Sequence, residues 1–298
     1  MSAPIFRLLG TTFRRFDKDQ CFRHSIVISY FTLLCAVPLI ALFAFVTTKV
    51  LGNSEIALRS LNIFTEDFFA RFDPVFFKKL GEASRNISNL GWFGLIGSAV
   101  AGSFLFSNLI AAINHVFKSA HKKSFFYNRL MEYAIMFLMA VILVVSLSIT
   151  AVWTALHKAI ESTTIVQEYL NPDVLPFLNN VLVQYLVPFT LGFLVLFTIY
   201  KFIPETKVHT RAAFLAAVAG SVLWEIFKRI FIVYIVHFSA IGIVLTKLVQ
   251  GTLTSIIFFL VWITFSLAIL LWGAELACAL NERIEEKKRE ARAPAPAP

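Results

Sequence analysis

Charged residues are scarce in this chain of 298 residues. Asp, Glu, Lys and Arg make up 15% of it, whereas an average soluble domain carries about 25%. Hydrophobic residues reach 58%, above the roughly 45–50% of soluble domains. A soluble fold has little use for so much apolar surface, but a lipid bilayer accommodates it. The composition therefore argues against a soluble helical bundle and predicts an integral membrane protein.

The sequence also lacks the motifs of soluble enzymes. It contains no Gly-rich phosphate-binding loop, no G-x-S-x-G motif and no cluster of soluble carboxylates. Its histidines show no H-x-H or H-E-x-x-H spacing, which argues against a metal centre. Cys21, Cys35 and Cys278 are not at redox or metal-ligand spacing, so we expect unlinked thiols. An ATPase or a conventional hydrolase is therefore not expected, and neither is a cofactor.

Long apolar stretches are abundant instead. Crossing the hydrocarbon core takes about 20 mainly apolar residues. Six stretches qualify, at roughly 25–48, 91–116, 131–156, 179–203, 211–237 and 252–280. The first has a longer apolar run than a signal peptide and no A-x-A cleavage site after it, so we expect it to be retained. The predicted fold is all-α: a polytopic membrane protein with about six transmembrane helices and interfacial amphipathic helices.

The segments outside the spans differ in character. Residues 1–24 are basic and amphipathic, which suits a helix on an anionic inner leaflet or, alternatively, a surface for a cytoplasmic partner. The transmembrane domain spans residues 25–281. The amphipathic sequence of its outer loop, 49–90, predicts either two interfacial helices or a lid over a cavity. The tail, 282–298, begins as a charged helix and ends in Pro and Ala.

Lys and Arg are distributed unevenly between the two sides of the predicted spans. The side that holds both termini carries about twice as many of them as the other side. Cytoplasmic segments of membrane proteins show this excess, so we expect both termini in the cytoplasm. The same excess explains the net charge of +9 without a nucleic-acid partner.

Small residues at four-residue steps predict where the helices touch, because close packing drives helix association in lipid. The second span carries Gly94, Ser98 and Gly102, and the fifth carries Ala212, Ala216 and Gly220. Pro38 removes a backbone hydrogen bond within the first span and predicts a kink, either a hinge or simply a bend.

Three charged residues interrupt the fifth span. Glu225 lies roughly 21 Å along a helix from Arg211, past the midplane of a core about 30 Å thick. An unpaired charge there costs about 2.5–3.5 kcal/mol, and Lys228 and Arg229 follow at the spacings where a helical carboxylate meets a cation. Two interpretations stay open. One is a self-neutralised pair that orients the helix, and the other is a polar site for an anionic head group, an ion or a proton.

Two further polar residues are candidates for the same site. Glu275 lies near the inner end of the last span, either at the aqueous interface or at the cytoplasmic lip of a cavity. Asn108 lies in the second span, where a hydrogen bond in helix packing is the simpler interpretation and substrate binding the alternative.

Four stretches in this order complete the pattern: SYFTLLCAVPLIALF, FSNLIAAINHVFK, FIPETKVHTRAAFLAAVAGSVLWEIFKRIFIVYI and WGAELACAL. Together they resemble the YihY/BrkB family of bacterial inner-membrane proteins over roughly residues 22–281. The resemblance implies a six-helix fold in the inner membrane but no settled activity. Family members have carried the label ribonuclease BN, and the BrkB name reflects a role in serum resistance.

The residues themselves argue against a nuclease. They supply no metal cluster, no catalytic carboxylate pair outside lipid and no stacking platform for RNA. Our first hypothesis is transport or rearrangement of a lipid or lipid-linked envelope molecule, with membrane lipids as partners. The alternatives are a proton- or ion-coupled carrier of a small solute that uses Glu225, and a non-transporting scaffold for envelope-assembly proteins. Substrate, direction, energy source and oligomeric state stay open.

Overall fold

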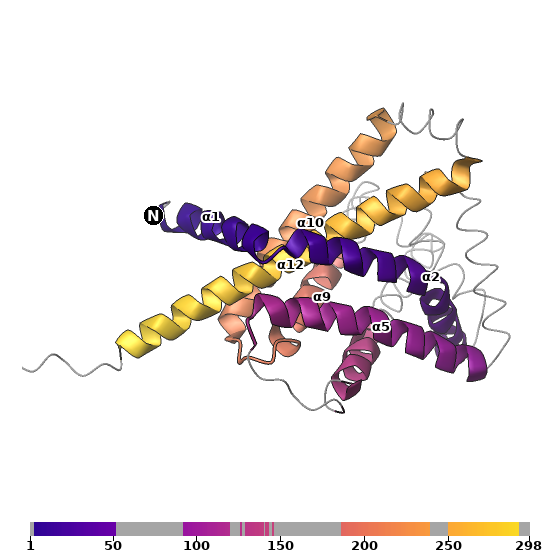
Figure 1. The fold of residues 1–298 in the computed structure, drawn as a ribbon, viewed down its shortest axis with the longest axis horizontal. Helices are drawn as coiled ribbons and strands as arrows, with labels where there is room; N and C mark the ends of the chain where they lie inside the picture. The colour runs from indigo at the N-terminus through magenta and orange to yellow at the C-terminus, as the bar shows by residue number, and fades with distance from the viewer. Residues whose placement is uncertain are drawn as a thin grey trace, which may run out of the picture.

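The computed structural model describes residues 3–51, 92–119, 129–139, 186–238 and 250–291, with a few neighbours of the third range. All regular secondary structure in these ranges is helical, as the sequence predicts (Figure 1). Most of the predicted loop 49–90, much of the span 131–156 and the Pro/Ala-rich end lie outside the described residues.

The first helix lies in the basic N-terminal segment, and the others follow the apolar stretches of the sequence. The helices are α1 (Ala3–Lys18), α2 (Cys21–Leu51), α5 (Trp92–Val116), α9 (Val187–Phe202), α10 (Thr210–Phe238) and α12 (Gln250–Glu290). Residues 129–139 are helical as well. Gln20, with a φ of 50°, separates α1 from α2 because few residues continue a helix in this left-handed conformation. The charged start of the tail is continuous with the last span, since α12 runs on to Glu290.

Helix α12 lies at the centre of the bundle. It packs against α1, α2, α5, α9 and α10, while α2 also lies along α5, and α9 along α10. Figure 1 shows α12 running through the molecule, with the start of α1 and the end of α12 at the same extremity. α12 therefore carries the side chains that hold the other helices together.

Two small-residue surfaces lie in helix contacts, as predicted. Ala212 and Ala216 of α10 are fully buried, and a Cβ on Gly220 would lie 3.0 Å from Leu196 Cδ1 of α9. Gly102 of α5 is buried, and the Cys35 thiol of α2 lies 3.0 Å from the neighbouring backbone oxygen of Ala101. Small side chains thus let both pairs of helices approach closely.

The other two positions named for helix shape are less informative. Gly94 lies in the first turn of α5. α2 continues through Pro38 as one helix and changes direction towards its C-terminal end (Figure 1). Proline is a usual cause of such a bend.

Helix α1 packs its apolar side against α12. Leu8, Leu9 and Phe16 lie against the core, and the Phe13 ring lies 5.6 Å from that of Trp272. The amphipathic pattern of residues 1–24 therefore serves in part to bind α1 to the protein itself. Its predicted place on the inner leaflet stays a prediction.

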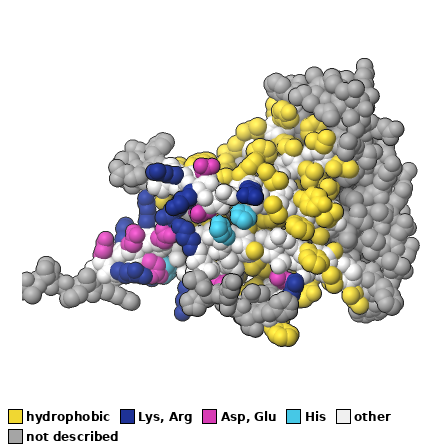
Figure 2. Space-filling view, in the orientation of Figure 1, with side chains coloured by type: hydrophobic (Ala, Val, Ile, Leu, Met, Phe, Trp, Pro, Cys, Tyr) yellow, Lys and Arg dark blue, Asp and Glu magenta, His cyan; other side chains and the backbone are white. Residues whose placement is uncertain are grey.

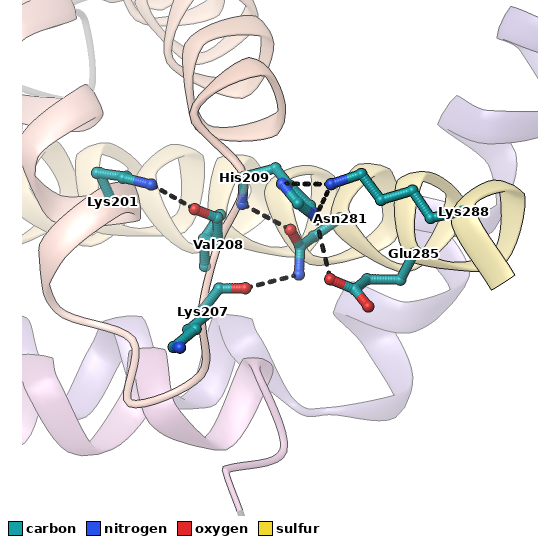
Figure 3. Close-up of polar contacts among 7 residues, drawn as sticks. All are labelled: Lys201, Lys207, Val208, His209, Asn281, Glu285 and Lys288. Carbon is teal, nitrogen blue, oxygen red and sulfur yellow. Dashed lines mark hydrogen bonds and ion pairs between the residues drawn. The ribbon is translucent and has the colours of Figure 1, made fainter. Parts of the chain in front are cut away.

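The connection between α9 and α10 is fastened to α12 (Figure 3). Asn281 Oδ1 accepts a hydrogen bond from the His209 N–H at 2.8 Å, and Asn281 Nδ2 donates to Lys207 O at 3.2 Å. The His209 ring contacts Glu285 Oε1 at 3.0 Å and Lys288 Nζ at 3.3 Å. These contacts set where α10 begins and place Thr210 level with the end of the predicted last span.

The described surface divides into a charged end and an apolar body. Most of the Lys, Arg, Asp and Glu side chains gather where α1 and the C-terminal part of α12 lie, and hydrophobic side chains are concentrated on the opposite half of the visible described surface (Figure 2). Two segments, Ala99–Val116 and Ile256–Glu290, are long and apolar enough to cross a membrane, and Cys21–Ala36 and Phe189–Phe202 are shorter apolar helices. Large apolar side chains such as Phe104 and Ile230 are more than half exposed. Lipid is the environment that favours such a surface.

Candidate functional site

Glu225 and Lys228 form an ion pair on α10. Lys228 Nζ donates to Glu225 Oε1 at 2.7 Å, and the exposed fractions of the two side chains are 24% for Lys228 and 22% for Glu225. Glu225 lies roughly 22 Å along the helix from Thr210, at about 1.5 Å per residue. We call this contact the α10 ion pair. Each charge compensates the other, which lowers the cost of placing either one at this depth.

Arg229 lies on the apolar outer side of α10. Its side chain is exposed, and so are those of Ile226 and Ile230 beside it. The structure thus places this guanidinium among exposed apolar side chains of α10.

An aromatic cluster adjoins the α10 ion pair between α10 and α12. Its members are Trp224, Phe227 and Phe231 of α10, and Trp262 and Phe265 of α12. The Trp262 ring lies 5.8 Å from Trp224, 5.0 Å from Phe227 and 5.0 Å from Phe231. Lys228 follows Trp224 by one helical turn and so projects from the same side of α10. Lys228 is therefore the residue next to Trp224 along this side of α10.

Glu275 lies elsewhere in the structure. It is 1% exposed, on α12, and the Cys21 thiol of α2 contacts its Oε1 at 3.6 Å. Trp262, which marks the level of the α10 ion pair, precedes Glu275 on α12 by roughly 20 Å. The structure therefore separates Glu275 from the α10 ion pair and places it where α1, α2 and α12 meet.

Asn108 also stays apart from the other candidates. Its Nδ2 donates to Phe104 O at 2.8 Å, within α5 itself. The candidate residues of the sequence thus divide into three places, and only Glu225, Lys228 and Arg229 share one turn of a helix.

A second ion pair was missed by the sequence reasoning. Arg129 Nη1 contacts Glu132 Oε2 at 2.7 Å and donates to Ser103 Oγ at 2.8 Å, and Ser103 Oγ donates to Glu132 Oε2 at 3.1 Å. Glu132 is 5% exposed. Ser103 lies roughly 20 Å along α5 from its end at Val116. The i,i+3 spacing of Arg129 and Glu132 was the available signal, but Arg129 was counted only as a cation of the inner surface.

Metal-binding side chains do not gather in the part of the chain that the structure describes. No group of three or more His, Cys, Asp or Glu residues there could hold a metal ion. The three cysteines are buried free thiols, which confirms the prediction made for them. Cys21 contacts Glu275, Cys35 contacts α5, and Cys278 contacts Glu282 of its own helix.

His24 and His115 face each other between α2 and α5, with ring centroids 5.2 Å apart. His24 precedes the first predicted span, and burial, then His115, then Arg23, lower its pKa from the ordinary 6.5. The unfolded chain therefore takes up a proton below about pH 6.5 that the folded protein resists. We therefore expect the free energy of unfolding to decrease as the pH is lowered from 7.5 to 5.5. Thermal unfolding in detergent measures this, and His24→Gln should flatten the dependence; an unchanged slope would contradict it.

Described residues that are helical, with an apolar body and a charged end, define an integral membrane protein. The chain belongs to the family described as virulence factor BrkB, whose model matches residues 12–298. This confirms the resemblance stated from the sequence motifs.

Relatives from several bacteria are named UPF0761 membrane protein. The one from Alteromonas mediterranea is 26% identical over 294 residues, which cover 97% of this chain and 92% of that relative. The one from Acinetobacter baylyi is 24% identical over 277 residues, covering 93% of this chain and 62% of the relative. The one from Vibrio campbellii is 25% identical over 273 residues, which cover 91% of this chain and 81% of that relative. No solved structure matches the chain.

Proposed function

We propose that the protein binds an anionic lipid or a lipid-linked envelope molecule at the α10 ion pair and moves it within or across the membrane. The observation that carries this proposal is the 2.7 Å contact of Glu225 with Lys228 on a helix that exposes large apolar side chains such as Ile226 and Ile230. Charged residues at such depth mark substrate pathways more often than they serve structure alone.

The chemistry of the ion pair suits an anionic head group. A phosphate oxygen competes with Glu225 for the Lys228 ammonium, and the partial exposure of both side chains leaves room for that exchange. Arg229 adds a second cation on the exposed side of α10. The acyl chains of such a ligand remain against the apolar surface of α10, so only the head group requires polar contacts.

The proposed setting is the bacterial inner membrane, with both ends of the chain in the cytoplasm. Cationic side chains gather at the extremity formed by α1 and the end of α12 (Figure 2). Cytoplasmic segments carry such an excess of Lys and Arg. The relatives are named membrane proteins, which supports the membrane location itself.

Lys228→Gln should slow lipid movement about tenfold, because a hydrogen bond to a charged group contributes about 1.5–3 kcal/mol. The assay follows a fluorescent anionic lipid in vesicles that contain the purified protein. Lys207→Gln is the matched control, since Lys207 is an exposed cation on the connection before α10. We expect Lys207→Gln to match the wild-type rate.

Three results would overturn the proposal. Wild-type protein that moves no anionic lipid above empty vesicles would remove its basis. Solute uptake that depends on a pH gradient and is lost in Glu225→Gln would favour a coupled carrier. One stoichiometric crosslinked partner, with Glu225 and Lys228 both dispensable, would favour an assembly scaffold.

A further inference from the structure

Two buried polar atoms, one on α10 and one on α12, have no hydrogen-bond partner. They are Trp224 Nε1 and Ser266 Oγ, two of four such side-chain atoms among the described residues. The other two, Ser119 Oγ and Trp272 Nε1, lie beyond the end of α5 and beside Phe13 of α1. A buried donor without an acceptor costs free energy, so such atoms in a native protein call for an explanation.

Trp224 and Ser266 lie at one level of the bundle. Phe227 of α10 stacks on both Trp262 and Phe265 of α12, at 5.0 and 5.6 Å. α10 and α12 run in opposite directions (Figure 1). One turn from Phe227 towards the start of α10 therefore reaches Trp224, and one turn from Trp262 towards the end of α12 reaches Ser266.

The cation of the α10 ion pair lies one helical turn from this level, towards the end of α10. Lys228 follows Trp224 by one turn on the same side of α10, and its Nζ is 2.7 Å from Glu225 Oε1. An indole N–H donates only, an ammonium donates only, and a serine hydroxyl can donate. The three groups together present donors to a ligand and require several acceptor oxygens in return.

We infer that Trp224, Ser266 and Lys228 form a subsite for the phosphate of an amphiphilic ligand; this inference rests on the proposed function and names its substrate class. A phosphate supplies several acceptor oxygens and one or more negative charges. The aromatic cluster receives the apolar part of the ligand next to the phosphate, since large aromatic rings bury apolar surface efficiently. Glu225 positions Lys228 until the ligand arrives.

A trade-off between stability and binding follows from this assignment. Trp224→Phe keeps a ring against Trp262 and removes the unpaired N–H, and Ser266→Ala removes the unpaired hydroxyl. Both variants should therefore unfold at the same temperature as the wild type, or at a higher one, in the absence of ligand. Both should bind ligand about tenfold more weakly, the loss expected for one hydrogen bond to a charged acceptor.

The test titrates three probes into the full chain in detergent: phosphatidylglycerol, a diacylglycerol with the same acyl chains, and inorganic phosphate. Ligand-induced thermal stabilisation and mass spectrometry of the intact complexes report binding. We expect phosphatidylglycerol to bind and diacylglycerol not to bind. If inorganic phosphate binds as tightly as phosphatidylglycerol, the subsite binds phosphate but its ligand is a soluble phosphate and not a lipid.

Trp272→Phe and Ser119→Ala are matched controls, because they remove the same unpaired groups elsewhere. The inference is overturned if all four variants bind phosphatidylglycerol like the wild type, or if all four lose it equally. Lipid movement that persists while Trp224→Phe and Ser266→Ala bind normally would retain the proposed function and reject the subsite. If these two variants bind phosphatidylglycerol more weakly but the wild type moves no lipid, the subsite is retained and the proposed function is rejected.

Discussion

Gly273→Ala should destabilise the protein by about 2–4 kcal/mol, the sum of overpacking and a lost buried hydrogen bond. A Cβ on Gly273 of α12 would overlap Tyr200 Oη of α9 and lie 2.8 Å from Tyr200 Cζ. Tyr200 is fully buried and donates to Leu270 O at 2.9 Å, so its ring cannot move aside without losing this bond. Thermal unfolding in detergent and the yield of folded protein measure the effect.

Two glycines of the same chain provide the control. A Cβ on Gly97 or Gly192 would meet nothing within 4 Å, and alanine is favoured over glycine in a helix by about 1 kcal/mol. Gly97→Ala and Gly192→Ala should therefore leave stability unchanged or raise it. Adding Tyr200→Phe to Gly273→Ala should recover part of the lost stability, because the second change removes the hydroxyl oxygen that the new Cβ would overlap. A Gly273→Ala protein as stable as Gly97→Ala would contradict the close packing of α9 against α12.

The contrast between Gly220 and Gly273 shows which helix contacts can be predicted from the sequence alone. Gly220 closes a series of small residues at helical spacing, which predicts a contact surface without reference to any partner. The notch at Gly273 is filled by Tyr200, which lies on another helix 73 positions earlier in the numbering. Periodicity within one helix identifies a surface that packs. It does not identify the large side chain that fills it, because that depends on how the helices are arranged.

The candidate site divides in the same way. Glu225 and Lys228 lie three positions apart, so local helix geometry predicts their contact, and the structure shows it. The separation of Glu275 from this pair depends on which residues of α10 and α12 face each other. The unpaired atoms of Trp224 and Ser266 depend on the same register. No spacing within a single helix contains that information.

The contact of Arg129 and Glu132 with Ser103 was inaccessible for a related reason. A count of Lys and Arg on alternate sides assigns each cation to a surface, and Arg129 follows the second predicted span closely enough to be counted there. The structure instead places its guanidinium against the middle of α5, through Ser103. Whether the segment that follows a span packs against that span depends on the tertiary structure, and a count of charges does not contain it.

Arg129→Gln should be strongly destabilising, by about 3–5 kcal/mol, because it leaves the Glu132 carboxylate buried without its cation. Glu132 is 5% exposed, and within the described residues its contacts are Arg129 and the single hydroxyl of Ser103. Glu132→Gln should cost less, since its amide oxygen still accepts from both Ser103 and Arg129. The Arg129 side chain is also 37% exposed, so its charge is partly solvated. Chemical unfolding in detergent measures both variants.

The double variant Arg129→Gln/Glu132→Gln separates the charge from the packing. If an uncompensated carboxylate is the cause, removing both charges should restore most of the stability lost in Arg129→Gln, because a neutral pair of similar shape replaces a buried ion pair at little cost. Lys228→Gln is the control, since Glu225 is 22% exposed and should tolerate the loss of its partner better. A double variant as unstable as Arg129→Gln alone would assign the loss to the shape of the arginine side chain. The segment 129–139 would then be held to α5 by packing, and the ion pair would only mark where the two helices meet.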